Sequence, residues 1–269
     1  MDNRPIGIFD SGLGGLTCVK EVMKIMPNED IIYFGDTGRV PYGTRSRETV
    51  IKYVKQDINF LETFDIKYII IACGTASSAA LPFIEEEYDA KISGVLYPAA
   101  QSAVKATKNK KIGVIGTTGT VKSGKYIEAI HSLMPDAEVF QKACPLFVPL
   151  VENGMTEDEA TSLIATEYLK EIRNAGVDTI ILGCTHYPLL TDVIREIVGE
   201  GVALIDSGAQ AAKFAKDDME KLGLLSEKKE KGKARFFVSD SIENFSELGS
   251  MFLQKEIDGD VFFTDIEKY

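Results

Sequence analysis

Two of the four cysteines stand in the same local context in the two halves of the chain. Cys73 directly follows the apolar run Tyr68–Ala72. Cys184 follows a second run, Thr179–Leu182, from which it is separated by one glycine. Uninterrupted apolar runs of this length are typical of strands buried on both faces of a parallel sheet. A predicted helix comes after each cysteine, so each sulfur is expected where a strand ends and a helix begins. The N–H groups and positive dipole of a helix N-terminus stabilise thiolate, and we therefore expect both thiols to be partly activated.

Two activated thiols can serve as an acid and a base on opposite faces of one carbon atom. The thiolate on one side removes a proton and the thiol on the other side returns one, and the two groups exchange roles in the reverse direction. Cys18 and Cys144 lack the strand-end context, and we interpret Cys18, on a predicted helix, as a buried core residue. The chain has no Cys-x-x-Cys pair and only two histidines, so we expect no metal site.

Polar residues that could assist these thiols lie beside Cys184 and at the end of the first predicted strand. His186 comes two residues after Cys184 and could orient or activate its thiol, although a lone histidine is more often a structural hydrogen-bonding residue. Asp10 ends the first strand, where a carboxylate could bind a substrate ammonium group or influence a cysteine. The glycines at positions 12, 14 and 15 form a loop whose N–H groups could bind an anion, and the alternative is a tight strand-to-helix turn.

Short apolar runs alternate with amphipathic segments along the chain, a pattern typical of parallel sheets covered by helices. The sequence IGIFDSG, from residue 6, is echoed by IGVIGTT, from residue 112, at an offset of 106, and the two cysteines lie 111 residues apart. We therefore predict an α/β fold of two pseudo-symmetric lobes, with parallel sheets flanked by helices. The first lobe would comprise residues 1–97 and 208–269, and the second 98–207. A ligand would bind at the lobe interface, facing the carboxyl ends of the strands.

Two local signals predict how individual helices begin or break. Thr156 and Glu159 have the spacing of a capping box, which predicts a helix from Thr156 to Asn174. A helix is also expected over Thr75–Glu87, interrupted at Pro82 because proline cannot continue an intrahelical hydrogen-bond pattern.

Composition excludes several classes of partner. The 269 residues carry a formal net charge of −11, so the chain lacks the basic surface that binds a phosphate backbone, and an anionic membrane would repel it. There is neither an 18-residue apolar stretch nor a signal-peptide pattern, and we expect a cytoplasmic protein. An anionic ligand would have to be held by local N–H groups rather than by the overall charge.

Taken together, five motifs resemble the glutamate racemases of bacterial cell-wall synthesis. They are Gly7–Gly15 (GIFDSGLGG), Tyr33–Gly43 (YFGDTGRVPYG), Ala72–Ser77 (ACGTAS), Cys144–Glu152 (CPLFVPLVE) and Leu182–Leu189 (LGCTHYPL). With Asp206-Ser207-Gly208 as a further match, the resemblance extends from residue 7 to about residue 208.

The resemblance implies racemisation of glutamate without pyridoxal phosphate or a metal, supplying D-glutamate for peptidoglycan. Cys73 and Cys184 would be the acid/base pair, each serving one enantiomer, and Asp10, Glu152 and His186 would assist them. The residues implied to contact the substrate are Ser11, Pro41, Tyr42, Gly43, Gly74, Thr75 and Thr185. Members of this family associate in more than one way, and a homodimer is one arrangement that the resemblance implies.

The chain departs from the family pattern at one position and leaves two alternatives open. The first cysteine motif usually reads Ala-Cys-Asn-Thr, whereas Gly74 stands here in place of the asparagine, so an amide that would contact the substrate is missing. An aspartate racemase of the same superfamily is one alternative, and His186 favours glutamate because aspartate racemases typically lack that histidine. A non-catalytic protein that binds a small ligand is the other, but it would have no use for two opposed thiols.

Overall fold

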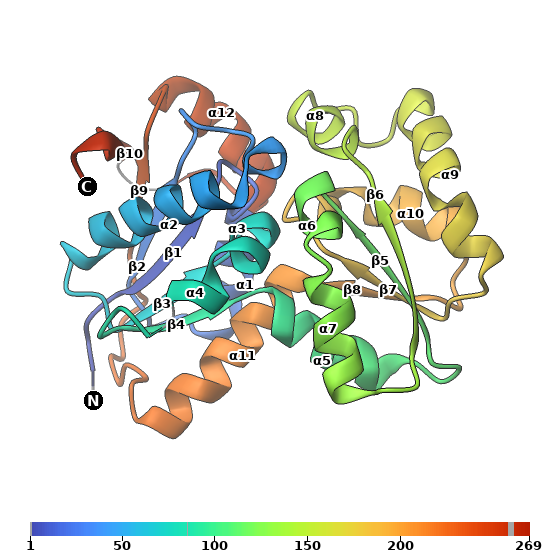
Figure 1. The fold of residues 1–269 in the computed structure, drawn as a ribbon. Helices are drawn as coiled ribbons and strands as arrows, with labels where there is room; N and C mark the ends of the chain where they lie inside the picture. Colours follow the sequence, from blue (N-terminus) through green and yellow to red (C-terminus); the bar gives the residue numbers. More distant parts are fainter. Residues whose placement is uncertain (1, 85, 258–260) are drawn as a thin grey trace.

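Two parallel sheets, each flanked by helices, lie beside one another in the computed structural model, which describes residues 2–84, 86–257 and 261–269 (Figure 1). The first sheet contains β1 (Ile6–Asp10), β2 (Ile31–Gly35), β3 (Tyr68–Ile71), β4 (Lys91–Gly94), β9 (Ala234–Val238) and β10 (Val261–Phe263). The second sheet contains β5 (Lys111–Gly116), β6 (Glu138–Ala143), β7 (Thr179–Leu182) and β8 (Ala203–Asp206). All paired strands are parallel.

The two lobes repeat one strand order. Four strands of the first sheet run β2-β1-β3-β4, and the second sheet runs β6-β5-β7-β8, so each strand has a counterpart four places later in the chain. The first sheet is extended beyond β2 by β9 and β10. This repeated order confirms the predicted pair of pseudo-symmetric α/β lobes. It also makes β3 and β7, the strands that precede Cys73 and Cys184, equivalent.

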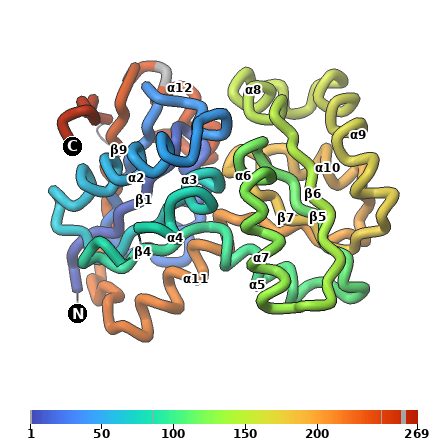
Figure 2. Tube along the Cα trace, in the orientation of Figure 1, coloured from blue at the N-terminus to red at the C-terminus, as the bar shows by residue number. Residues whose placement is uncertain are grey.

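Helices surround both sheets and carry the chain between them. Those of the first lobe are α1 (Leu16–Ile25), α2 (Arg47–Glu62), α3 (Gly74–Ala79), α4 (Leu81–Ile84) and α12 (Ile242–Leu253). Those of the second lobe are α6 (Thr118–Lys122), α7 (Lys125–Leu133), α8 (Phe147–Glu152), α9 (Glu159–Asn174) and α10 (Thr191–Val198). Short 3₁₀ helices span Tyr42–Thr44, Tyr187–Leu190 and Ile266–Lys268. The chain crosses into the second lobe through α5 (Leu96–Ala106) and returns through α11 (Ser207–Leu222), which pack together (Figure 2).

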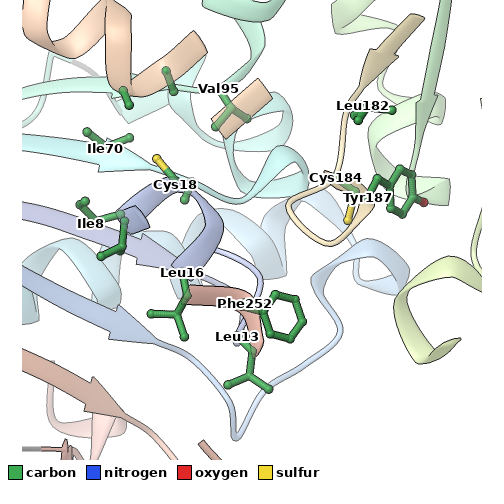
Figure 3. Packing of buried hydrophobic residues seen from close by; sticks show 14 of the residues in the cluster. Ile8, Leu13, Leu16, Cys18, Ile70, Val95, Leu182, Cys184, Tyr187 and Phe252 are labelled. Carbon is green, nitrogen blue, oxygen red and sulfur yellow. The ribbon is translucent and has the colours of Figure 1, made fainter. Parts of the chain in front are cut away.

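The hydrophobic core continues from one lobe into the other. Every residue of β1, β2, β3 and β7 is buried, as the apolar runs predicted for strands covered on both faces. One cluster of buried side chains joins the first lobe to the second, and Figure 3 shows part of it. Cys18 lies there close to Ile8 and Ile70, whereas Cys184 occupies the loop that follows Leu182. The core position predicted for Cys18 is therefore confirmed.

Several local predictions differ from the structure. The capping box at Thr156 is wrong, because α9 begins at Glu159 and the hydroxyl of Thr161 donates to the carbonyl of Met155, folding the preceding segment back. The helix break expected at Pro82 falls at Ala80 instead, and Pro82 is the second residue of α4, where no intrahelical donor is needed. The helices α5, α6 and α8 and the strand β10 were not predicted. Among the described residues, no helix is long and apolar enough to cross a membrane.

A buried ion pair lies at the amino-terminal ends of the strands of the first sheet, on the side opposite to their carboxyl ends. Lys67 Nζ lies 2.5 Å from Glu29 Oε2, and the two side chains are 0% and 3% exposed. Lys67 also donates to the carbonyl of Asp2, and Glu29 accepts from the N–H of Ser226 at 2.7 Å. The pair therefore ties the N-terminal segment and the segment after α11 to the same end of the sheet.

We expect Lys67→Met to lower the free energy of unfolding by about 3–5 kcal/mol, because it leaves the Glu29 carboxylate buried without its partner. Urea denaturation followed by circular dichroism measures the change. Lys55→Met is the matched control, since Lys55 and Glu87 are 39% and 46% exposed. Removing that surface pair should cost less than about 1 kcal/mol. Equal losses in the two variants would contradict a stabilising role for the buried pair.

Candidate active site

A cavity of about 370 Å³ lies between the two lobes at the carboxyl ends of their strands. Its walls come from the segments after β1, β2 and β3 in the first lobe and from those after β5, β6 and β7 in the second. Eleven of the twelve residues proposed from the sequence line it, and Asp10 does not. The eleven are Ser11, Pro41, Tyr42, Gly43, Cys73, Gly74, Thr75, Glu152, Cys184, Thr185 and His186.

Cys73 caps the N-terminus of α3 and is 5% exposed. Its sulfur accepts a hydrogen bond from the N–H of Ala76 at 3.4 Å, and its thiol donates to the hydroxyl of Ser11 at 3.5 Å. Burial, reinforced by the negative charge of Asp10, raises the pKa of Cys73 to about 11, although the backbone N–H groups of Ser11 and Ala76 act in the opposite direction. The expectation that the helix N-terminus would activate this thiol is therefore wrong for the protein without ligand, because desolvation is the larger effect.

Cys184 occupies the equivalent place after β7 and is 7% exposed. Burial raises its pKa well above that of an ordinary thiol, and the backbone N–H of His186 only partly offsets this. The Nδ1 atom of His186 lies 3.9 Å from the sulfur, and its Nε2 atom lies 3.0 Å from Glu152 Oε1. The ring also packs edge-on against Phe252 of α12. His186 is thus fixed between a carboxylate and the thiol.

Asp10 lies beneath the cavity wall and is fully buried. One carboxylate oxygen accepts from the N–H of Gly12 at 2.9 Å, and the other accepts from the hydroxyl of Thr185 at 3.4 Å. Desolvation raises the pKa of Asp10, while the positive charge available to His186 lowers it. Because Thr185 belongs to the second lobe, this hydrogen bond joins Asp10 across the lobe boundary to a residue that does line the cavity.

The lobes approach each other closely at two glycines, of which Gly74 lines the cavity. A Cβ atom on Gly14 would lie 2.1 Å from the hydroxyl of Thr185, and one on Gly74 would lie 2.3 Å from the carbonyl oxygen of Gly183. A hydrogen bond of 2.9 Å between the hydroxyls of Thr75 and Thr117 also crosses the boundary. The glycine at position 74 therefore does more than omit an amide, since it allows this close contact.

Tyr42 lines the cavity, but its hydroxyl is turned to other partners. That oxygen is hydrogen-bonded to the carboxylates of Asp36 and Asp57, and the residue is only 1% exposed. Any contact between Tyr42 and a ligand would therefore use other atoms of the residue.

Thr117 and Thr118 line the cavity and were missed in the sequence. The internal repeat contained the signal, because the offset of 106 that pairs residue 6 with residue 112 also pairs Ser11 with Thr117. Apart from the two thiols and the phenol of Tyr42, the ionisable side chains of the described lining are Glu152 and His186, with no lysine or arginine. Hydroxyls and N–H groups are consequently the donors available to an anionic ligand. The described part of the chain holds no cluster of three or more His, Cys, Asp or Glu residues suited to a metal ion.

Comparison with known proteins connects this arrangement to one family. Residues 17–215 match the Asp/Glu/hydantoin racemase family model. A glutamate racemase of Geobacter metallireducens is 47% identical over 264 residues, which cover 98% of this chain and 97% of the relative. The structure of a Francisella tularensis glutamate racemase in complex with D-glutamate is similar with a TM-score of 0.93, at 39% identity over 100% of both chains. A glutamate racemase isoform of Bacillus anthracis also gives 0.93, at 37% identity, covering 97% of this chain and 98% of the other. The chain therefore belongs to the Asp/Glu/hydantoin racemase family, among its glutamate racemases.

Proposed function

We propose that this enzyme interconverts L-glutamate and D-glutamate by passing the Cα proton between Cys73 and Cys184. The observation that carries the proposal is that the two thiols follow equivalent strands of two pseudo-symmetric lobes and line one cavity. Groups contributed by opposing lobes can reach opposite faces of a bound carbon atom. D-Glutamate formed in this way would supply peptidoglycan synthesis.

The proton balance of the proposed reaction needs no external oxidant or cofactor. The thiolate of one cysteine forms an S–H bond as the Cα–H bond of glutamate breaks, and the electron pair is delocalised into the α-carboxylate. The S–H bond of the other cysteine then breaks and a Cα–H bond forms on the opposite face. One turnover leaves the protonation of the two sulfurs exchanged, so the enzyme is ready for the opposite enantiomer.

The surrounding residues fit separate tasks in this scheme. Ser11, Thr75 and Thr185 offer hydroxyls, and with the N–H groups of the glycine-rich loops they would bind the two carboxylates of glutamate. His186, held by Glu152, would orient the thiol of Cys184 and exchange a proton with it. The remaining proposed contacts, Pro41, Tyr42, Gly43 and Gly74, would shape the wall around the substrate, and Asp10 would act through Thr185.

Thiol ionisation must change when the substrate binds. Burial raises the pKa of both thiols and so favours their protonated forms, whereas the proposed reaction requires one thiolate. The α-ammonium group of glutamate brings a positive charge into a cavity whose described lining has no lysine or arginine. A nearby positive charge favours thiolate, so the substrate itself would help to ionise the base.

The raised pKa of Cys73, about 11, predicts the pH dependence of its alkylation in the free enzyme. Only the thiolate reacts, so the rate with iodoacetamide should rise about tenfold per pH unit between pH 7 and pH 10. Brief labelling followed by mass spectrometry of the peptide that contains Cys73 measures this rate. A rate that levels off near pH 8.5, as for an ordinary thiol, would show that burial does not govern this sulfur.

The direct test of the proposed function is incubation with L-glutamate in heavy water without added pyridoxal phosphate. We expect D-glutamate that carries deuterium at Cα, followed by chiral chromatography and mass spectrometry. Cys73→Ala and Cys184→Ala should each lower racemisation by about 10²–10⁴-fold, because each removes one acid/base group. Cys144→Ala is the matched control, since Cys144 is buried but does not line the cavity, and it should keep the activity.

Other outcomes would replace the proposal. Deuterium exchange into aspartate but not glutamate would identify an aspartate racemase. Binding of glutamate without exchange would identify a non-catalytic binding protein. Full racemisation in either Cys73→Ala or Cys184→Ala would refute the two-thiol mechanism.

A further inference from the structure

Five consecutive residues, 40–44, form one side of the cavity, and we call them the wall segment. Apart from the short 3₁₀ helix at Tyr42–Thr44, the wall segment has no regular structure of its own. It is anchored from behind by Asp36, which follows β2, and by Asp57 on α2, both 0% exposed. Arg39, which immediately precedes the wall segment, completes this cluster with a side chain that is 10% exposed.

Hydrogen bonds connect this cluster and Tyr42 of the wall segment into a closed ring of four residues. Arg39 donates from Nε to Asp36 Oδ2 at 2.7 Å and from Nη2 to Asp57 Oδ1 at 2.9 Å. The hydroxyl of Tyr42 is bonded to Asp36 Oδ2 and, at 2.9 Å, to Asp57 Oδ2. Both carboxyl groups are therefore held by the same guanidinium and the same phenol.

The ring contains one hydrogen too few if both carboxyl groups are ionised. A phenol carries a single O–H hydrogen, but Tyr42 makes two O···O hydrogen bonds, so one of the two must take its hydrogen from a carboxyl group. Two carboxylates and one guanidinium would also leave a net negative charge in a buried site, which is strongly unfavourable. One additional proton satisfies both hydrogen bonds and makes the cluster neutral.

The partners of each carboxyl group indicate which one holds the proton. Asp36 accepts from three donors, namely Arg39, Tyr42 and the hydroxyl of Ser239 at 2.8 Å, which favours its ionised form. Asp57 is hydrogen-bonded to only two of the described side chains, Arg39 and Tyr42. The other groups that face Arg39 are Gln56 Oε1 at 2.6 Å, the ring of Tyr53, and the exposed carboxylate of Glu267 at 3.4 Å. Burial, followed by the charge of Asp36, raises the pKa of Asp57 well above its usual range.

We propose that Asp57 is a protonated positioning residue, which donates to Tyr42 while Tyr42 donates to Asp36, and that this neutral ring sets the position of the wall segment. The part of the proposal that concerns the substrate rests on the proposed function, because the wall segment would contact glutamate. The part that concerns the proton does not, and it can be measured without any activity.

The proton is tested by urea denaturation of wild type and Asp57→Asn between pH 5 and pH 8. The amide of asparagine reproduces a protonated carboxyl group, accepting from Arg39 and donating to Tyr42, but it cannot titrate. A group whose pKa is raised on folding stabilises the folded state fully at low pH, and this contribution decreases as the pH rises above the unfolded value of about 3.9. The unfolding constant of wild type relative to Asp57→Asn should therefore increase about tenfold per pH unit. A ratio independent of pH would show that Asp57 is ionised and overturn the proposal.

The positioning role is tested by comparing the same neutral substitution at the two carboxyl groups. Asp57→Asn should keep the KM for glutamate within about threefold of wild type, whereas Asp36→Asn removes the counter-charge of Arg39 and should raise KM at least about tenfold. Asp57→Ala, which cannot bond to Tyr42, should also raise KM more than it lowers kcat. Equal KM values in all three variants, each folded by circular dichroism, would overturn the positioning role. A KM that rises in Asp57→Asn but not in Asp36→Asn would instead assign the proton to Asp36.

If none of these enzymes converts glutamate, the denaturation experiment still decides whether the ring holds the additional proton. In that case the proposed function fails, and the inference about the proton is judged on its own.

Discussion

Stereoinversion at one carbon atom requires a proton donor on one face and an acceptor on the other, and both must be held by the same rigid frame. Here that frame is built by repeating one strand order, so that β3 and β7 are each followed by a cysteine at the same cavity. The lobes approach each other so closely that some positions leave no space for a side chain, as at Gly74 against the carbonyl of Gly183. The shared hydrophobic core and the hydrogen bond between Thr75 and Thr117 maintain the same relation.

The two cysteine sulfurs are buried in a cavity that would suit proton transfer from carbon, but the same burial opposes thiolate formation. The backbone N–H groups of Ser11 and Ala76 stabilise the charged form of Cys73, yet desolvation outweighs them and raises its pKa to about 11. In the proposed reaction, a base of this strength would suit the removal of a weakly acidic proton, provided that the substrate helps to create the anion. Glutamate, which carries its own ammonium group, can meet that condition without a resident cation in the described lining.

Local sequence patterns predicted the central strands and the positions of the two cysteines well, because both signals are short and repeated. Apolar runs marked β3 and β7, and the motif after each run placed one cysteine in each lobe. Thr117 was missed because it enters the cavity at the start of α6, a helix too short to show helical periodicity, although the internal repeat pairs it with Ser11. The effect of burial on the thiols and the ring around Tyr42 depend on residues brought together by the fold, so no local pattern could reveal them.

A crystal structure of the wild-type enzyme with D-glutamate bound would test the central claim most directly. The account predicts that the α-carbon of the ligand lies between the sulfurs of Cys73 and Cys184, one on each face and each about 3.5 Å away. Two sulfurs on the same face of the α-carbon, or a bound glutamate whose α-carbon is within reach of only one sulfur, would contradict proton transfer between two opposed thiols.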